Sequence, residues 1–242
     1  MRERVERQPA YVLHERPYRE TSAILELLSR DHGRVAVVAR GLRAPKPRFA
    51  RGALRALQPL ECGWIGQGEM GQLIAVEVIG LPQAVTAMQL QSVLYLNELL
   101  VRLLARNDPH PRVFDAYAGL LGDLPRANAV LGFALRRFEK DLLAELGYGI
   151  DFAWDLATQA PVREQGYYRV DPEQGVFAVA GPGRGALPGG ALLALAAGVL
   201  PAAELLADLR RMMRSLLLHH LGGHGLQAWR VLRSPVPPAD PA

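Results

Sequence analysis

The stretch YVLHERPYRETSAILELLSRDHGRVAVVARGLR, residues 11–43, decides the fold of the N-terminal part of the chain. Short apolar runs rich in β-branched residues alternate there with turn signals, and Asp31-His32-Gly33 before a Val-rich run predicts a hairpin. The pattern continues to residue 79 without a helical period. The expected strands are residues 11–14, 23–28, 34–39, 57–65 and 73–79. Five short strands in about 70 residues predict a small closed barrel of the OB type. An SH3-like barrel fits this pattern almost as well.

The hydrophobic period changes to a helical one after Leu81-Pro82. We expect helices over residues 84–105, 109–121 and 125–146, with Gly147 as a C-cap, and a last long helix between Pro201 and Gly222. The Gly- and Pro-rich segment around residues 150–190 predicts a β-hairpin inserted between helices. The fold class is therefore α+β. The expected domains are an OB-type barrel over residues 1–81, a mainly helical domain over 82–234 and a Pro-rich tail over 235–242.

Composition places the chain among ordinary globular proteins with a basic balance. It has 242 residues, half of them hydrophobic, and a formal net charge of +4. The single cysteine, Cys62, allows neither an internal disulfide nor a Cys-rich zinc site. The N-terminus resembles no signal peptide, and the longest apolar run, residues 191–200, is too short to span a bilayer. We therefore expect a cytoplasmic protein without a membrane partner.

The strongest functional signal is a stretch without acidic residues between His32 and Leu60. Prolines and glycine keep its central part irregular, and one aromatic residue lies among the cations. A cationic loop on a small barrel is how OB domains hold single-stranded nucleic acid, because cations follow the phosphates and a ring stacks on a base. A solvated basic loop without a partner is the alternative. The candidate DNA-binding residues are Arg34, Arg40, Arg43, Lys46, Arg48, Phe49, Arg51 and Arg55.

Two expected helices also carry closely spaced cations. Arg136 and Lys140 are four residues apart, with Arg137 beside them, and Arg210 and Arg214 repeat this spacing. Like charges at this spacing destabilise a helix by a few tenths of a kcal/mol, which an acidic partner would relieve. An ordinary hydrated helix face is the alternative.

No group of residues predicts a metal site, a cofactor site or a catalytic centre. His220 and His224 are four apart, but Gly222-Gly223 interrupts the helix between them. The Gly-rich segment 181–185 lacks the ending of a phosphate-binding loop, and Cys62 lies in an apolar strand. We therefore expect a protein that is not an enzyme and has neither a metal nor another cofactor.

Several segments together resemble the RecO family: residues 11–43, 57–70 (LQPLECGWIGQGEM), 95–104 (YLNELLVRLL), 113–117 (VFDAY), 135–152 (LRRFEKDLLAELGYGIDF) and 219–233 (HHLGGHGLQAWRVLR). The resemblance implies an OB domain and a helical domain that bind single- and double-stranded DNA and anneal complementary strands. It implies as partners the acidic tail of single-stranded DNA-binding protein (SSB), RecR and, indirectly, RecA. It places Arg136 in the pocket for the SSB tail, with Leu135 and Phe138 nearby. This agrees with the helical cations noted above, so the candidate residues for binding the tail are Leu135, Arg136, Arg137, Phe138 and Lys140.

One departure from the family pattern concerns zinc. Some members of the family carry a four-cysteine zinc site in the region that matches residues 153–180, where this chain has no cysteine. The inserted hairpin must therefore be held by its own packing.

Rival functions remain open at this point. An RNA-binding or ribosome-associated OB protein would share the barrel and the basic loop, and a protein-only adaptor would use the basic faces for acidic proteins. A nuclease is the least favoured reading, because no clustered carboxylates are placed to hold catalytic metal ions. The favoured function is a mediator of recombinational DNA repair that anneals strands by neutralising their charge.

Overall fold

The computed structural model describes residues 3–50, 52–66, 70–80, 84–124 and 130–231. They form two compact units, one of Met1–Leu121 with Gly225–Ala242 and the other of Gly122–His224. Packing thus groups the first helices with the N-terminal strands, while the domain boundary at residue 81 stays a prediction.

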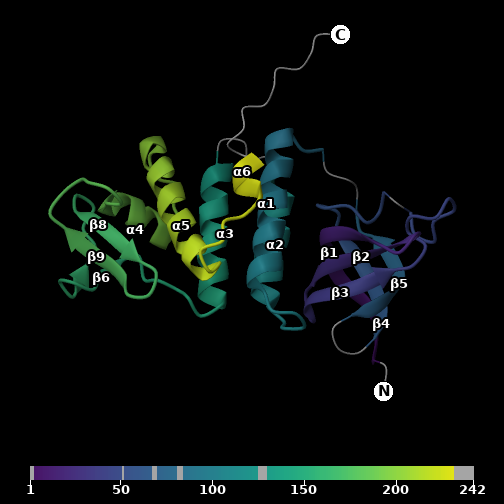
Figure 1. Ribbon diagram of the computed structural model, residues 1–242. Helices are drawn as coiled ribbons and strands as arrows, with labels where there is room; N and C mark the ends of the chain where they lie inside the picture. Colours follow the sequence, from purple (N-terminus) through teal and green to yellow (C-terminus); the bar gives the residue numbers. More distant parts are fainter. Residues whose placement is uncertain (1–2, 51, 67–69, 81–83, 125–129, 232–242) are drawn as a thin grey trace, which may run out of the picture. The chain divides into compact units, whose positions relative to one another are not determined.

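The N-terminal strands close into a five-stranded barrel (Figure 1). The strands are β1 (Glu3–Tyr18), β2 (Ser22–Ser29), β3 (Gly33–Ala39), β4 (Leu60–Gly66) and β5 (Gly71–Val78). Their order around the barrel is β1-β2-β3-β5-β4, and β1 closes it by pairing with both β2 and β4. All pairs are antiparallel except the short parallel pair β3–β5. This Greek-key closure is the OB arrangement, so the predicted fold class is confirmed.

Strand β1 is much longer than the predicted segment 11–14. Its first half alternates buried residues such as Val5 with exposed charged residues, and Arg7 has a positive φ of 51°. Register shifts between Val5 and Gln8 and between Val12 and His14 bend the strand, so that it pairs first with β4 and then with β2. Sequence pattern missed this half because bulges interrupt the regular alternation.

Helices α1 (Ala87–Leu103) and α2 (Pro111–Asp123) pack against β1 through a buried polar link. The Asn97 side-chain amide donates to the carbonyl oxygen of Leu13 at 3.1 Å, next to the second bulge of β1. The Tyr117 hydroxyl donates to Asn97 Oδ1 at 2.6 Å, and the Tyr11 ring contacts the Tyr117 ring edge-on. Burial raises the pKa of Tyr117, which keeps this hydroxyl a donor. The link fixes both helices on the barrel.

A short helix, α6 (Ala228–Val231), returns to this unit and was not predicted. The Glu98 carboxylate accepts hydrogen bonds from the backbone N–H groups of Gln227 at 2.7 Å and Ala228 at 2.9 Å. A carboxylate at the start of a helix satisfies backbone donors that have no partner within the helix.

The second unit combines helices with a small sheet (Figure 1). Its helices are α3 (Leu131–Glu145), α4 (Gly189–Ala197), the short 3₁₀ helix η2 (Ala203–Leu205) and α5 (Leu206–His220). Its strands are β6 (Trp154–Asp155), β7 (Ala160–Pro161), β8 (Tyr167–Asp171), β9 (Gly175–Val179) and β10 (Leu187–Pro188), in the order β10-β8-β9-β6-β7. The predicted hairpin is β8–β9, whereas α4 and the short flanking strands were not predicted. Gly147, with a φ of 85°, caps α3 as expected.

A buried aspartate holds this sheet together. Asp155 Oδ1 accepts backbone hydrogen bonds from Ala157 at 2.9 Å and from Ala178 at 3.1 Å, and its Oδ2 accepts one from the Thr158 hydroxyl. Burial opposes the charge of Asp155, but these hydrogen bonds outweigh it and lower the pKa of the carboxyl group. Within the described residues, no three His, Cys, Asp or Glu side chains are grouped so as to hold a metal ion.

Two further sequence expectations concern Cys62 and membranes. Cys62 is fully buried in the barrel core, and burial raises the pKa of its thiol to about 12, so it remains a neutral core residue. None of the helices in the described part of the chain is both long enough and apolar enough to cross a membrane.

Candidate nucleic-acid interface

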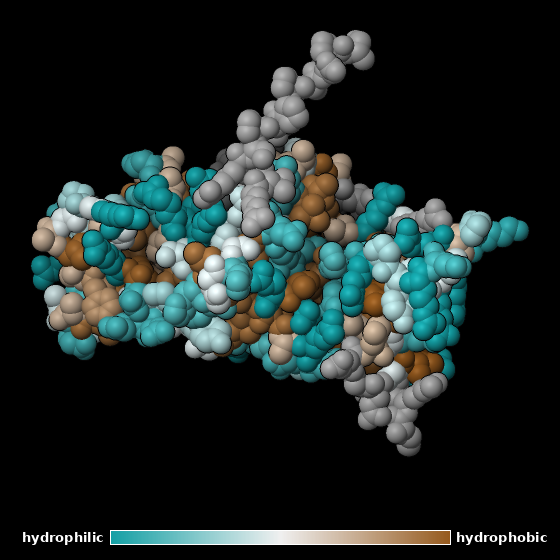
Figure 2. Space-filling model, viewed as in Figure 1, coloured by the Kyte–Doolittle hydropathy of each residue, from teal (hydrophilic) through white to brown (hydrophobic). Residues whose placement is uncertain are grey.

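The connection between β3 and β4, residues 40–59 and here called the cationic loop, is irregular but anchored. Leu42, Phe49 and Leu54 are buried in the barrel core cluster and fix the loop to the barrel. Between and directly beside these anchors the structure exposes cations, and Figure 2 shows hydrophilic side chains projecting over this part of the barrel. The exposed cations are Arg40, Arg43, Lys46, Arg48 and Arg55. Arg51 lies outside the described residues.

The prediction that the Phe49 ring stacks on a base does not fit its position in the structure. Its side chain is only 8% exposed and packs in the barrel core, so it anchors the loop and offers no open face for a base. The Arg48 guanidinium lies over this ring, 5.4 Å from its centroid, and donates to the Ile74 carbonyl oxygen at 3.4 Å. The ring therefore positions Arg48 at the β5 side of the loop.

Arg34 also lies apart from the exposed cations. Its guanidinium donates to Glu26 Oε2 at 3.2 Å and to the Leu104 carbonyl oxygen at 3.0 Å, and Arg106 pairs with the same glutamate. Burial lowers the pKa of Arg34, and the Glu26 carboxylate opposes this shift. The pair ties β2 and β3 to the segment after α1, so we assign Arg34 to the framework of the barrel and leave it out of the proposed interface.

A groove of about 470 Å³ lies beside the cationic loop on the barrel. Its walls come from the end of β1, from β3, from the end of β4 and from the start of β5. They include Tyr18, Arg40, Met70, Gln72 and Ile74. The face over strands 2 and 3, flanked by the loops after strands 1 and 4, is where OB folds bind oligonucleotides. We call this feature the barrel groove.

The barrel groove supplies the aromatic face that Phe49 does not. Tyr18 is half-buried at one end, and the Arg19 guanidinium lies 5.2 Å from the centroid of its ring. The sequence pattern predicted neither residue, because both lie outside the acid-free stretch between His32 and Leu60. The signal that could have found them is their position at the end of the first strand and in the turn after it, next to the loop that OB barrels use for binding. With Arg40 in the groove wall, the groove joins a stacking ring to cations.

The cations of α3 divide between the inside and the outside of the second unit. Arg136 is buried and pairs with Glu139, which is fully buried one turn later. Phe138 is also buried, and Leu135 is partly buried. Arg136 and Lys140 therefore do not form the shared exposed face that their spacing predicted, because the Arg136 side chain points into the unit.

Arg137 and Lys140 instead come together at the C-terminal end of α4. The Lys140 ammonium donates to the Leu195 carbonyl oxygen at 3.3 Å. The Arg137 side chain is exposed and lies against Gly198, where an added Cβ would be 3.4 Å from its Nε. The next two residues, Val199 and Leu200, are 62% and 47% exposed. The cations Arg137 and Lys140 and the exposed aliphatic residues Val199 and Leu200 thus lie at the same end of α4, and we call them the tail surface.

Comparisons with known proteins cover nearly the whole chain. The family model described as recombination protein O N terminal matches residues 1–82, and the one described as recombination protein O C terminal matches residues 89–230. A protein of Aromatoleum aromaticum named DNA repair protein RecO is 44% identical over 234 residues, which cover 96% of this chain and 97% of that protein. Proteins of the same name from Azoarcus sp. and Xanthomonas oryzae pv. oryzae are 43% identical over 238 residues and 40% identical over 237 residues. They cover 96% and 94% of this chain, and 97% and 96% of those proteins.

Proposed function

This chain belongs to the RecO family of DNA repair proteins, and from that premise we propose that it is a repair mediator that binds single- and double-stranded DNA and anneals complementary strands. The observation that carries the proposal is the barrel groove, which has a tyrosine ring at one end and opens beside the cationic loop.

A single strand lies along the barrel groove in this proposal. One base stacks on Tyr18, while Arg19, Arg40 and Arg48 contact the phosphates beside it. Lys46 and Arg55, further along the cationic loop, contact neighbouring phosphates of the same strand or of its complement. Stacking and phosphate contacts of this kind do not depend on base sequence, as a general repair protein requires.

Annealing follows from charge neutralisation. Two single strands repel each other because each carries a phosphate charge at every nucleotide. A strand held by its backbone on a cationic surface keeps most of its base edges free, and a second strand approaches with less repulsion. The reaction needs no ATP and no catalytic side chain.

We further propose that the second unit binds the acidic tail of SSB. Arg137 and Lys140 are the cations for its carboxylates, and Val199 and Leu200 form the apolar surface for its hydrophobic side chains. Arg136 acts indirectly, by fixing α3 through its buried pair with Glu139. Together with RecR, this contact would bring the protein to SSB-coated DNA and help RecA to load there.

The test is annealing of complementary oligonucleotides coated with SSB, with intact SSB in one arm and tail-less SSB in the other. The proposal expects faster annealing than without the protein, and a loss of that acceleration with tail-less SSB. No acceleration in either arm would refute the annealing function. A structured RNA in a third arm tests the RNA-binding alternative, which tighter binding to RNA than to oligothymidylate would favour.

The tail site has its own test. Arg137→Glu should abolish binding of a peptide with the SSB tail sequence, because an acidic peptide would then meet a carboxylate, and should leave binding of naked DNA unchanged. Arg169→Glu, which changes an exposed arginine of β8 in the same unit, is the matched control. Peptide binding that survives Arg137→Glu would place the tail elsewhere.

A further inference from the structure

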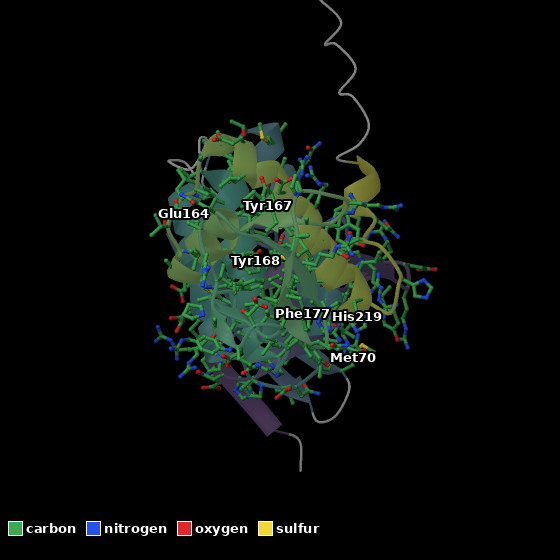
Figure 3. All side chains as sticks on the ribbon, turned by 90° about the vertical axis from the view of Figure 1, so that its left-hand side faces the viewer. Met70, Glu164, Tyr167, Tyr168, Phe177 and His219 are labelled. Atoms are coloured by element: carbon green, nitrogen blue, oxygen red, sulfur yellow. The ribbon has the colours of Figure 1, made fainter. Side chains whose placement is uncertain are left out.

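A pocket of about 580 Å³ in the second unit plays no part in the functions above. It lies between the segment after α3, the β8–β9 turn and the C-terminal end of α5. Ile150, Leu156 and Val176 give it apolar walls. Figure 3 shows His219, from the end of α5, and the β8–β9 residues Tyr167, Tyr168 and Phe177 of the neighbouring sheet.

Aromatic rings that face this pocket are unusually exposed. Tyr148 is 49% exposed and Trp154 is 38% exposed, although large rings in a monomer normally bury most of their surface. The Tyr148 ring stacks on the His220 ring with centroids 4.3 Å apart and planes 22° apart. This stacking holds the tyrosine ring in place while leaving it open to a ligand. Exposed, fixed aromatic rings are typical of interaction sites.

The charges around the pocket are negative. Asp151 and Glu173 contribute carboxylates to its lining, and the C-terminal end of α5 adds the partial negative charge of its last carbonyl groups. Burial, and then the neighbouring His219, lower the pKa of His220, so this ring carries no positive charge at neutral pH. Among the described residues that line the pocket there is no lysine or arginine. The His219 Nε2 atom lies 3.4 Å from Glu173 Oε1.

We propose that this pocket binds an arginine or lysine side chain from a basic segment of a partner protein. The cationic head would lie over the Tyr148 and Trp154 rings and near Glu173, where ring faces and carboxylates both attract it. The aliphatic stem would cover the apolar wall at Leu156, which is 41% exposed. A DNA strand is the less suitable occupant, because its phosphates would meet two carboxylates and, among the described lining residues, no lysine or arginine.

The experiment follows the indole N–H resonance of Trp154 in the ¹⁵N-labelled full chain, assigned by its loss in Trp154→Phe. The probe is a capped glycine pentapeptide with a central arginine, and the control peptide carries citrulline, which has nearly the same shape without the charge. The proposal expects a saturable shift with the arginine peptide and none with citrulline. An equal shift with both peptides, or none with arginine at millimolar concentrations, would overturn it.

Two variants test the role of charge. Glu173→Gln should weaken binding of the arginine peptide about two- to fivefold, as expected for an exposed ion pair. Glu173 is an exposed turn residue, so this change should not affect folding. Glu164→Gln is the matched control, since this exposed glutamate does not line the pocket and lies well apart from His219 in Figure 3. A larger loss of arginine-peptide binding with Glu164→Gln than with Glu173→Gln would contradict the proposal. A shift of the Trp154 resonance on addition of oligothymidylate would contradict it as well.

Discussion

Removing three cations of the cationic loop should change the salt dependence of DNA binding by a predictable amount. The variant is Arg40→Ala, Lys46→Ala and Arg48→Ala in one chain. All three side chains are exposed, so the substitutions should each change the free energy of unfolding by no more than about 0.5 kcal/mol. Arg19 and Arg55 remain as the other two cations that the proposal places on phosphates.

The magnitude follows from counterion release. Each phosphate contact with a single strand contributes about 0.7 to the slope of log K against log salt. Five contacts predict a slope of about −3.5, so that affinity falls about 130-fold between about 50 mM and about 200 mM salt. Two remaining contacts predict a slope of about −1.4 and a fall of only about 7-fold.

The assay is fluorescence anisotropy of labelled oligothymidylate at several salt concentrations. The matched control removes three exposed arginines of the second unit, Arg163, Arg169 and Arg184, and thus the same net charge. We expect the control to keep the slope of the unmodified protein. If both triple variants change the slope equally, the effect comes from total charge, and the cationic loop is not the DNA site.

Three further predictions concern single side chains. Tyr18→Ala should weaken oligothymidylate binding about 5- to 150-fold in the same anisotropy assay, because stacking on one base contributes about 1–3 kcal/mol. Tyr18→Phe keeps a ring and should keep most of the affinity. If Tyr18→Ala binds oligothymidylate as tightly as the unmodified protein, Tyr18 is not part of the site. Arg136→Ala should lower the free energy of unfolding by about 3–5 kcal/mol in urea titrations, because Glu139 is then left buried without its cation. The double variant Arg136→Met with Glu139→Leu should recover much of this loss. If Arg136→Ala is as stable as the unmodified protein, the pair does not have this structural role. Asp155→Asn should lower the free energy of unfolding by about 1–3 kcal/mol at neutral pH, because it weakens the hydrogen bonds that Asp155 accepts within the sheet. Because the pKa of Asp155 is lowered in the folded state, its stabilising effect is present above the unfolded value near 3.8 and is lost as the pH falls through the folded value. Thermal melts from neutral to acid pH should therefore show a steeper loss for the unmodified protein than for the variant, and parallel curves would exclude this role.

The proposed surfaces for DNA and for the SSB tail differ in how firmly the fold positions them. Leu42, Phe49 and Leu54 anchor the cationic loop in the barrel core, while Arg40 lines the barrel groove and Arg48 donates to the carbonyl oxygen of Ile74 in its wall. The tail surface rests on backbone contacts instead, because Lys140 is fixed by the Leu195 carbonyl group and Arg137 lies against Gly198. Substitution of Leu42, Phe49 or Leu54 should therefore weaken DNA binding although it removes no cation.

The sequence by itself determined the class of the fold and predicted the region that we propose as the DNA site. Period-two runs punctuated by Asp31-His32-Gly33 predicted a barrel, and the change of period after residue 81 predicted helices, because both signals depend only on neighbouring residues. The acid-free stretch likewise identified the cationic loop, since charge composition is visible without coordinates. The choice of an OB barrel over an SH3-like one needed the strand order, which depends on pairing between distant segments.

Tertiary structure alone decided which side chains of these segments face solvent. Arg34 and Arg136 have the same charge as their exposed neighbours, yet each turns inward to a glutamate that the fold buries. Phe49, which was expected to offer a stacking face in the basic loop, packs into the core, whereas Tyr18 at the end of β1 lines the groove. The physical reason is that a side chain's partners are set by which distant elements pack against it. A local pattern of charge and hydrophobicity carries no record of that packing.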